Sequence, residues 1–283
     1  MEFRNLSPAI GSEVVGIDVG ALDDRSFPAL RRTWCERGLL LFRGQALDGP
    51  GLARFSRRFG ELEPPPASER SGREGAGAAE APEVWLISNV LEDGKPIGSL
   101  GYGEAEWHTD MSYLDAPPSA SLLYGREVPA TGGNTWFASM TAAIQAMPED
   151  LRRVIEGRKA RHDASYTSAG DLRRGASEVT DVRTTPGAEH PIVRAHPETG
   201  QPCLFLGRRR NGYVVGLELD ESETLLDRLW AFSTRPEFVY VHRWRAGDLL
   251  VWDNRSVIHR RDGFDAAARR VMLRTQVKGD RPH

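Results

Sequence analysis

The chain has 283 residues, of which 40% are hydrophobic and 27% are charged, an ordinary composition for a soluble globular protein. Its formal net charge of −3 gives no reason to expect nucleic acid or an anionic membrane as a partner. The amino terminus lacks the apolar core of a signal peptide, and no run approaches the ~20 apolar residues of a membrane span. We therefore expect a cytoplasmic protein in which Cys35 and Cys203 are reduced thiols.

The amino-terminal part of the chain predicts two helices around a buried strand. A helix is expected over residues 24–37, where apolar side chains recur at helical spacing and Gly38 follows the last turn. Residues 39–42 are predicted to form a buried strand, and a second helix is expected over 48–59. The stretch 64–82 is rich in Pro, Ser, Gly, Ala and Glu, so we expect a mobile loop there.

Short strand signals recur through the rest of the chain and outnumber the helices. They fall at 84–87, 121–124, 135–137, 192–194, 203–206, 238–244, 248–252 and 269–277. Helices are expected over 139–156, with a restart at Met147-Pro148, and over 220–233, where Asp220 and Glu223 form a capping box. This pattern predicts a mostly β fold with flanking helices, arranged as a double-sheet jelly roll.

The whole chain, residues 1–283, is expected to form a single domain, because strand signals resume directly after the 64–82 stretch. A polar segment with scattered Gly and Pro, 162–190, interrupts the strands later in the chain. A loop of this length inside a domain is usually a lid or is disordered. We favour a mobile lid, because the segment lies between the two segments that carry the candidate metal ligands.

The most informative motif is His108-Thr109-Asp110. Two residues apart on an extended strand, His108 and Asp110 would point to one face, with Thr109 on the other. His259 follows a buried strand and a turn, and we expect it at a strand end beside the motif. Two imidazoles and one carboxylate hold Fe(II) on one face of an octahedron and leave the opposite positions open for chemistry.

A His-x-acid pair alone is weak evidence, because a chain of this composition contains about one by chance. The second match, His196-Pro197-Glu198, is followed by Gly200 and Pro202 and lies between two short strands. We interpret it as a solvated hairpin turn.

Two arginines share one face of a predicted strand. Arg270 and Arg274 alternate with Val271 and Leu273, while Arg269 is expected to lie outside. A guanidinium grips a carboxylate or sulfonate with two parallel hydrogen bonds, so the strand fits the wall of an anion-binding cavity. The alternative, from the local sequence, is that Arg270 and Arg274 lie on a charged strand face exposed to solvent.

Several motifs together, in this order, resemble the Fe(II)/2-oxoglutarate-dependent dioxygenases of the taurine dioxygenase and phenoxyacetate-herbicide dioxygenase type. The resemblance runs from about residue 8 to 279. The matching segments are 38–45, 55–60, 107–110, 116–118, 129–135, 252–255 with His259, and 269–270 with Arg274.

The resemblance implies three iron ligands, His108, Asp110 and His259. It implies that Arg270 and Thr135 bind the distal carboxylate of 2-oxoglutarate and that Arg274 faces the primary substrate, often a sulfonate or carboxylate in this family. It implies that the fold is a distorted double-stranded β-helix. It also implies an enzyme that uses O2 and 2-oxoglutarate, oxidises an unactivated C–H bond of the substrate, and releases succinate and CO2. Related halogenases lack the carboxylate ligand, so the presence of Asp110 favours hydroxylation.

Candidate residues of the substrate wall come from several segments, and they are Asn89, Tyr102, Glu104, Tyr113 and Arg210. Arg210 belongs to the basic run 208–210, which is either a solvated loop or part of the cavity mouth. At the mouth, the run would favour an anionic or multiply carboxylated substrate. Glu104 could instead bind a substrate amine, and Glu104 together with the basic run would suit a zwitterionic substrate.

Two other classes of protein compete with the dioxygenase. A zinc hydrolase could use the same three ligands, although hydrolysis needs no clamp for a dianion of the kind that Arg270 and Thr135 would form. A non-catalytic jelly-roll binding protein is the other alternative, and the presence of all three ligands with both arginines argues against it. A homo-oligomer, dimer or tetramer, is common in the family, but no surface signal in the sequence decides the matter.

Overall fold

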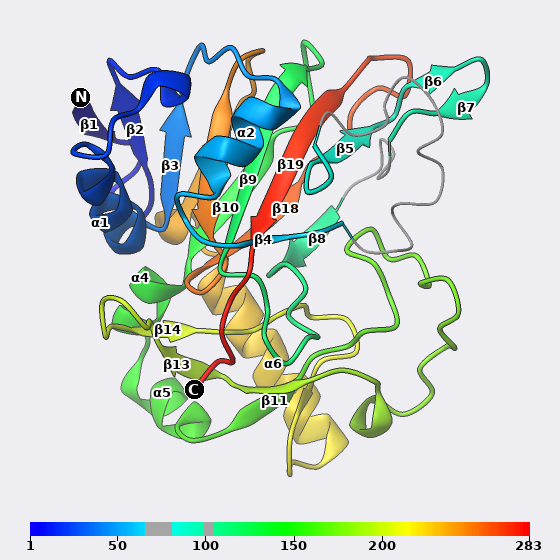
Figure 1. The fold of residues 1–283 in the computed structure, drawn as a ribbon. Helices are drawn as coiled ribbons and strands as arrows, with labels where there is room; N and C mark the ends of the chain where they lie inside the picture. The colour runs from blue at the N-terminus through cyan, green and yellow to red at the C-terminus, as the bar shows by residue number, and fades with distance from the viewer. Residues whose placement is uncertain (66–80, 99–104) are drawn as a thin grey trace.

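The computed structural model describes residues 1–65, 81–98 and 105–283 (Figure 1). Most of the expected loop 64–82 lies outside these ranges, as do Tyr102 and Glu104. Helices of the described part are α1 (Phe27–Arg37), α2 (Gly49–Ser56), α4 (Met140–Gln145), α5 (Glu149–Ile155) and α6 (Leu219–Ser233), with 3-10 turns at Val19–Ala21, Val182–Thr184 and Pro236–Phe238. Within these ranges, no helix has the length and apolarity to cross a membrane.

Two antiparallel-rich sheets carry the fold. The larger has the order β1-β2-β3-β17-β9-β19-β4, with β5 also paired to β19, and the smaller has the order β16-β10-β18-β8. Strands of the larger sheet are β1 (Glu2–Asn5), β2 (Ser12–Val15), β3 (Leu39–Phe42), β4 (Leu62–Glu63), β5 (Trp85–Ser88), β9 (Ala120–Glu127), β17 (Leu249–Asp253) and β19 (Val271–Val277). Strands of the smaller sheet are β8 (Ala105–His108), β10 (Thr135–Ser139), β16 (Val239–His242) and β18 (Val257–Arg261).

Smaller strand groups complete the described part of the chain. A three-stranded sheet has the order β12-β11-β15, and two hairpins pair β13 with β14 and β6 with β7. Their bounds are β6 (Leu91–Glu92), β7 (Lys95–Pro96), β11 (Lys159–Arg161), β12 (Glu189–Pro191), β13 (Val193–Ala195), β14 (Pro202–Leu204) and β15 (Tyr213–Val214).

Strand β3 shows how the sequence builds the layers. All four of its residues are buried, because alternate side chains point to opposite faces of the sheet and both faces are covered. Leu39 and Leu41 pack toward the smaller sheet, in one cluster with Phe137 of β10 and Val257 of β18. On the other face, α1 and α2 cover a second apolar cluster, to which β3 contributes Leu40 and Phe42. The larger sheet is therefore sandwiched between helices and the smaller sheet (Figure 1).

The outer face of the smaller sheet is covered by a third layer. Ala138 of β10 and Ile258 of β18 pack there with the apolar faces of α4, α5 and α6. These helices gather with β11, β13 and β14 in the lower half of Figure 1. The inner face of the smaller sheet remains turned toward the larger sheet, where a site between the two sheets can form.

Helix ends largely follow the sequence signals. Gly38 ends α1 with a φ of 70° and donates its N–H to Trp34 O, a conformation that glycine adopts without strain. The predicted break near Met147-Pro148 separates α4 from α5. The capping box at Asp220 was wrong, because α6 begins at Leu219 and no side chain caps its first turn.

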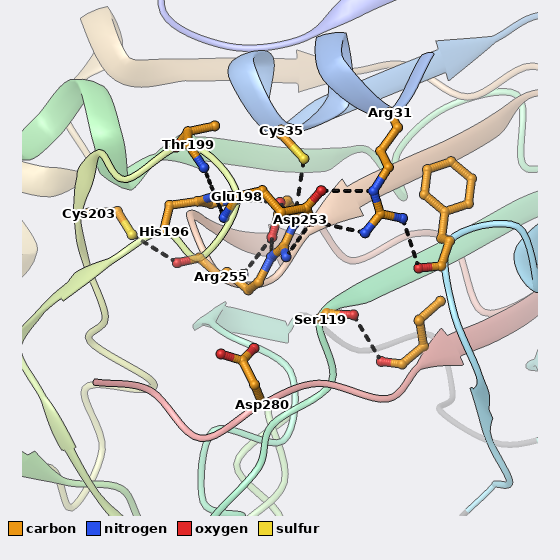
Figure 2. A network of polar contacts seen from close by, with 12 residues as sticks. Arg31, Cys35, Ser119, His196, Glu198, Thr199, Cys203, Asp253, Arg255 and Asp280 are labelled. Atoms are coloured by element: carbon orange, nitrogen blue, oxygen red, sulfur yellow. Dashed lines mark hydrogen bonds and ion pairs between the residues drawn. The ribbon is translucent and has the colours of Figure 1, made fainter. Parts of the chain in front are cut away.

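The second His-x-acid match lies in the predicted hairpin turn, between β13 and β14, and most of that turn is exposed as expected, but His196 is not solvated. His196 is 1% exposed, and its Nε2 lies 2.9 Å from Asp253 Oδ2. Figure 2 shows that the Arg255 guanidinium donates hydrogen bonds to the same carboxylate and to that of Glu198. The Glu198 carboxylate also accepts a hydrogen bond from Arg31 of α1. His196 is thus buried against the turn that follows β17, where Asp253 satisfies its imidazole, while Pro197, Glu198 and Gly200 of the hairpin turn are exposed.

Candidate metal centre

The three predicted metal ligands meet where β8 and β18 pair. His108 lies opposite His259 in the antiparallel register, and their ring centroids are 4.2 Å apart. Asp110 Oδ1 lies 3.6 Å from His108 Nε2 and 3.7 Å from His259 Nε2. All three side chains are buried, and their ligand atoms lie within 4.8 Å of one another. A single ion can therefore contact all three from one side.

The backbone reaches this arrangement by a route that the sequence did not predict. Strand β8 ends at His108, so Asp110 is not on the strand with it. Thr109 instead donates its N–H to Gly207 O, and Met111 has a φ of 47°. A turn thus brings the carboxylate back beside the imidazole. His259 lies in the middle of β18 rather than at its end.

Protonation states at the site match those that a metal requires. His108 Nδ1 donates to Glu106 O at 2.7 Å, which leaves the Nε2 lone pair facing the other ligands. Burial lowers the pKa of His259 well below its usual range, which keeps the imidazole neutral. Burial would raise the pKa of Asp110, but Arg274, 2.5 Å from Oδ2, and the two histidines together outweigh burial and hold the pKa well below its usual range. The Nε2 atom of His108, the neutral imidazole of His259 and the Asp110 carboxylate form a ligand set that fits a divalent ion such as Fe(II).

A second cluster of ligand-type side chains does not fit a metal. Cys35, His196 and Asp253 also bring their ligand atoms within 4.8 Å of one another. Both oxygens of Asp253, however, accept hydrogen bonds from the Arg255 guanidinium, at 2.8 and 2.7 Å (Figure 2). The guanidinium supplies the positive charge that a metal ion would otherwise bring.

A mainly apolar cavity with an empty volume of about 790 Å³ adjoins the two histidines. Its walls come from both sheets and include Ile87, Leu123, Thr135, Trp252, Arg261, Arg270 and Arg274. Thr135 Oγ1 accepts a hydrogen bond from Trp244 Nε1 at 2.9 Å, so its hydroxyl hydrogen remains able to donate to a ligand.

Arg270 places a charge in that cavity. It precedes β19 directly, rather than lying on the strand as predicted, and is 2% exposed. Its Nε has no hydrogen-bond partner among the described residues, and burial, with the charge of Arg261, lowers its pKa to about 9. A buried cation in this state is stabilised by an anionic ligand.

A second cavity adjoins the first and shares His108, Ser168 and Arg274 with it, and Asp110 also lines this second cavity. Three arginines line it, Arg173, Arg208 and Arg274, and Asp110 is the acidic residue in its wall. The Arg173 guanidinium lies 4.6 Å from the ring centre of Tyr113. Arg208 is buried and donates hydrogen bonds to the carbonyl oxygens of Tyr166 and Thr167. These bonds hold the 162–190 segment against this cavity.

The predicted substrate residues divide into three groups. Tyr113 and Arg274 line the second cavity, whereas Tyr102 and Glu104 lie outside the described residues. Asn89 lines neither cavity, and its side chain is bonded to the backbone of 266–270.

The basic run 208–210 is split between three environments. Arg209 pairs with Glu223 and Asp227 of α6, and Arg210 pairs with Glu106 at 3.4 Å, outside both cavities. Arg208 is the member of the run that reaches the site. Sequence reasoning missed Arg173, because nothing in the polar segment distinguishes it from its neighbour Arg174.

Comparisons with known proteins agree with this geometry. The model of the taurine catabolism dioxygenase TauD, TfdA family matches residues 2–276, and the chain belongs to this family. It is 33% identical over 293 residues to the (S)-phenoxypropionate/alpha-ketoglutarate-dioxygenase of Delftia acidovorans, covering 99% of this chain and 95% of the relative. It is 34% identical over 288 residues to the alpha-ketoglutarate-dependent 2,4-dichlorophenoxyacetate dioxygenase of Cupriavidus pinatubonensis, covering 97% and 96%.

Solved structures show the same fold. A taurine dioxygenase from Burkholderia xenovorans superposes with a TM-score of 0.77 at 31% identity, covering 99% of this chain and 90% of that one. AAD-2 in complex with Mn(II) and N-oxalylglycine gives 0.79 at 28% identity, covering 99% and 98%. The predicted jelly roll is confirmed. The chain is an Fe(II)- and 2-oxoglutarate-dependent dioxygenase with O2 as the other co-substrate, and neither the zinc hydrolase nor the binding protein gains support.

Proposed function

We propose that His108, Asp110 and His259 hold the Fe(II), and that Thr135 and Arg270 bind the distal carboxylate of 2-oxoglutarate. The observation that carries this assignment is the buried Nε of Arg270, which has no hydrogen-bond partner among the described residues and lines the same cavity as the two histidines. A dianionic co-substrate needs such a charged partner in a dry pocket. When bound, iron and 2-oxoglutarate supply the oxidation and yield succinate and CO2.

The second cavity is our candidate for the primary substrate, a small organic anion that is hydroxylated at an unactivated C–H bond. Three guanidiniums against one carboxylate favour an anion there. Arg173 supports this most directly, because it has no ion pair within the described ranges and lies over Tyr113. We assign it the role first predicted for Arg210, and keep Arg274 as a substrate contact. Aryloxy carboxylates are the first class to test, since two relatives are named for them.

Finer aspects of the protein also remain predictions. We propose a cytoplasmic, single-domain enzyme that forms a homo-oligomer and binds neither nucleic acid nor membrane. Segment 162–190 is proposed to be a mobile lid, and the presence of Ser168 and Arg173 in the wall of the second cavity supports its role as a cover. Glu104 is proposed to contact a substrate amine. A zwitterionic substrate would then place its amine at Glu104 and its acidic group at the arginines.

The test is succinate formation from 2-oxoglutarate with Fe(II), ascorbate and air, measured against sulfonates, sulfate esters, aryloxy acids and amino acid derivatives. One class should stimulate turnover, and His108→Ala should abolish it. Arg173→Gln should raise the KM for the stimulating substrate by tenfold or more, at about 1.4 kcal/mol per tenfold, and leave the KM for the co-substrate 2-oxoglutarate unchanged. Arg174→Gln, at the exposed neighbour, is the matched control.

The outcomes separate the parts of the proposal. A complete absence of succinate, including slow turnover without substrate, would contradict the cofactor assignment. Equal changes in both KM values for the Arg173 variant would exclude its role in substrate binding. Equal effects of the Arg173 and Arg174 variants would do the same.

A further inference from the structure

The carboxylate proposed to bind the metal, Asp110, accepts a hydrogen bond from a buried hydroxyl, that of Ser121 near the start of β9. Ser121 is 0% exposed, and its Oγ lies 2.7 Å from Asp110 Oδ2. Its neighbours follow from strand register, because Trp252 of β17 and Gln276 of β19 lie opposite it on either side. Ser121 is therefore the point where three adjacent strands of the larger sheet meet the metal centre.

The direction of the Ser121 hydroxyl proton is fixed by the groups around it. Asn254 Nδ2 donates to Ser121 Oγ at 3.0 Å, Gln276 Nε2 at 3.1 Å and Arg274 Nη2 at 3.3 Å. Donors fill the lone pairs of the hydroxyl, so its one proton has Asp110 Oδ2 as its acceptor.

The orientation of the Asn254 amide is itself determined. Trp252 Nε1, which can only donate, lies 2.9 Å from Asn254 Oδ1. The amide nitrogen must therefore face Ser121. A chain of buried hydrogen bonds runs from Trp252 through Asn254 and Ser121 to Asp110, and the Trp252 ring packs against His259 at 4.8 Å.

The turn that carries Asn254 is anchored on its other side by the network of Figure 2. Asp253 is held there by His196 and Arg255, and its N–H donates to Gly38 O. The N–H of Asn254 donates to Ser119 O at 3.0 Å. The amide is thus held by a rigid support and does not depend on a mobile loop.

The two oxygens of Asp110 consequently have different environments. Oδ2 accepts from Ser121 and Arg274, whereas Oδ1 faces the two imidazoles at 3.6 and 3.7 Å. We infer that Ser121 is a positioning residue that presents Asp110 to the metal through one oxygen and so keeps the remaining coordination positions open. This rests on the proposed metal role of Asp110. Hydrogen bonds to ligand residues commonly tune metal affinity in this way.

The experiment compares Mn(II) binding, followed by electron paramagnetic resonance of the free ion, in the wild-type protein and in Ser121→Ala. The dissociation constant should rise roughly 10- to 100-fold. Ser56→Ala is the matched control, because Ser56 is also 0% exposed and its hydroxyl is bonded to Leu52 O and Thr275 Oγ1, away from the ligands. It should lose similar thermal stability but keep its Mn(II) affinity.

A second variant covers the case in which Ser121→Ala fails to fold. Asn254→Asp keeps an acceptor for Trp252 but replaces the donor to Ser121 by an acceptor that competes for the hydroxyl proton. Mn(II) affinity should fall, and the visible spectrum of bound Co(II) should change, with Ser121 still present.

Four results would be decisive. An Mn(II) affinity within about threefold of wild type in both variants overturns the positioning role, as does an equal loss in Ser56→Ala. Failure of the wild-type protein to bind Mn(II), or binding that His108→Ala leaves intact, overturns the metal centre itself.

Discussion

Replacing Arg270 by glutamine tests the co-substrate pocket most directly. The side chain is 2% exposed, its backbone N–H is held by Asn89 Oδ1 at 3.0 Å, and its guanidinium faces the cavity beside the histidines. Glutamine removes the charge and the parallel pair of donors but keeps a polar side chain of intermediate length. Arg269→Gln is the control, because that exposed neighbour pairs with Glu127 on the surface.

The magnitude follows from burial. Removing one partner of a buried, hydrogen-bonded charge pair costs about 2–5 kcal/mol of binding free energy, because the other charge is left unpaired. At about 1.4 kcal/mol per tenfold, the dissociation constant for 2-oxoglutarate should rise roughly 30-fold to several thousand-fold. The unliganded variant should be no less stable than wild type, since Arg270 is a buried cation beside Arg261.

The assay is a calorimetric titration in which 2-oxoglutarate is added to the Mn(II)-loaded protein without oxygen, together with urea unfolding of the unliganded protein. The reasoning is refuted if Arg270→Gln binds 2-oxoglutarate within about threefold of wild type. It is also refuted if Arg269→Gln weakens binding as strongly as Arg270→Gln.

Two further predictions concern stability. Burial lowers the pKa of His162 to about 3, so as pH falls below the usual ~6.5 the unfolded chain gains a proton that the folded chain does not. His162 should cost about 2 kcal/mol of stability between pH 6.5 and 5, and urea unfolding of His162→Leu should lack that part of the loss; an unchanged loss contradicts it. Arg255→Met should lower the free energy of unfolding by about 3–5 kcal/mol, because Asp253 stays buried without its main partner. Arg4→Met, at an exposed pair that solvent screens, should leave the free energy of unfolding nearly unchanged, and equal effects of the two variants would contradict this account.

The elements that sequence reasoning predicted well are those whose signal is local. The spacing of apolar residues and the glycine at position 38 located α1, and the continuous apolar run of β3 correctly indicated burial on both faces. The resemblance to the family pointed to His108, Asp110 and His259, and the fold brings them together. It did not give the turn after His108, because a period of two along a strand contains no information on where the strand ends.

Errors arose where a polar residue has its partner far along the chain. His196 has the local sequence of a solvated turn, and its burial depends on Asp253, 57 residues later. Arg173 has no distinguishing neighbour, and its place in the second cavity depends on how the 162–190 segment folds over Tyr113. Only the tertiary structure supplies these partners, so composition and periodicity could not separate them from surface charges.

The sequence around Ser121 indicates that its hydroxyl has a buried partner, but it does not identify that partner. A serine in the buried run Ala120-Ser121-Leu122-Leu123 is costly unless its hydroxyl is bonded, so the residue itself signals a partner. The same signal is present at Gln276, inside β19. Identifying the partner, however, requires the register that sets Ser121 between Trp252 and Gln276, and that register is fixed by pairing between strands more than a hundred residues apart. A polar residue in a buried strand therefore indicates a hydrogen-bond network from the sequence alone. That this network is bonded to the Asp110 carboxylate becomes evident only from the fold.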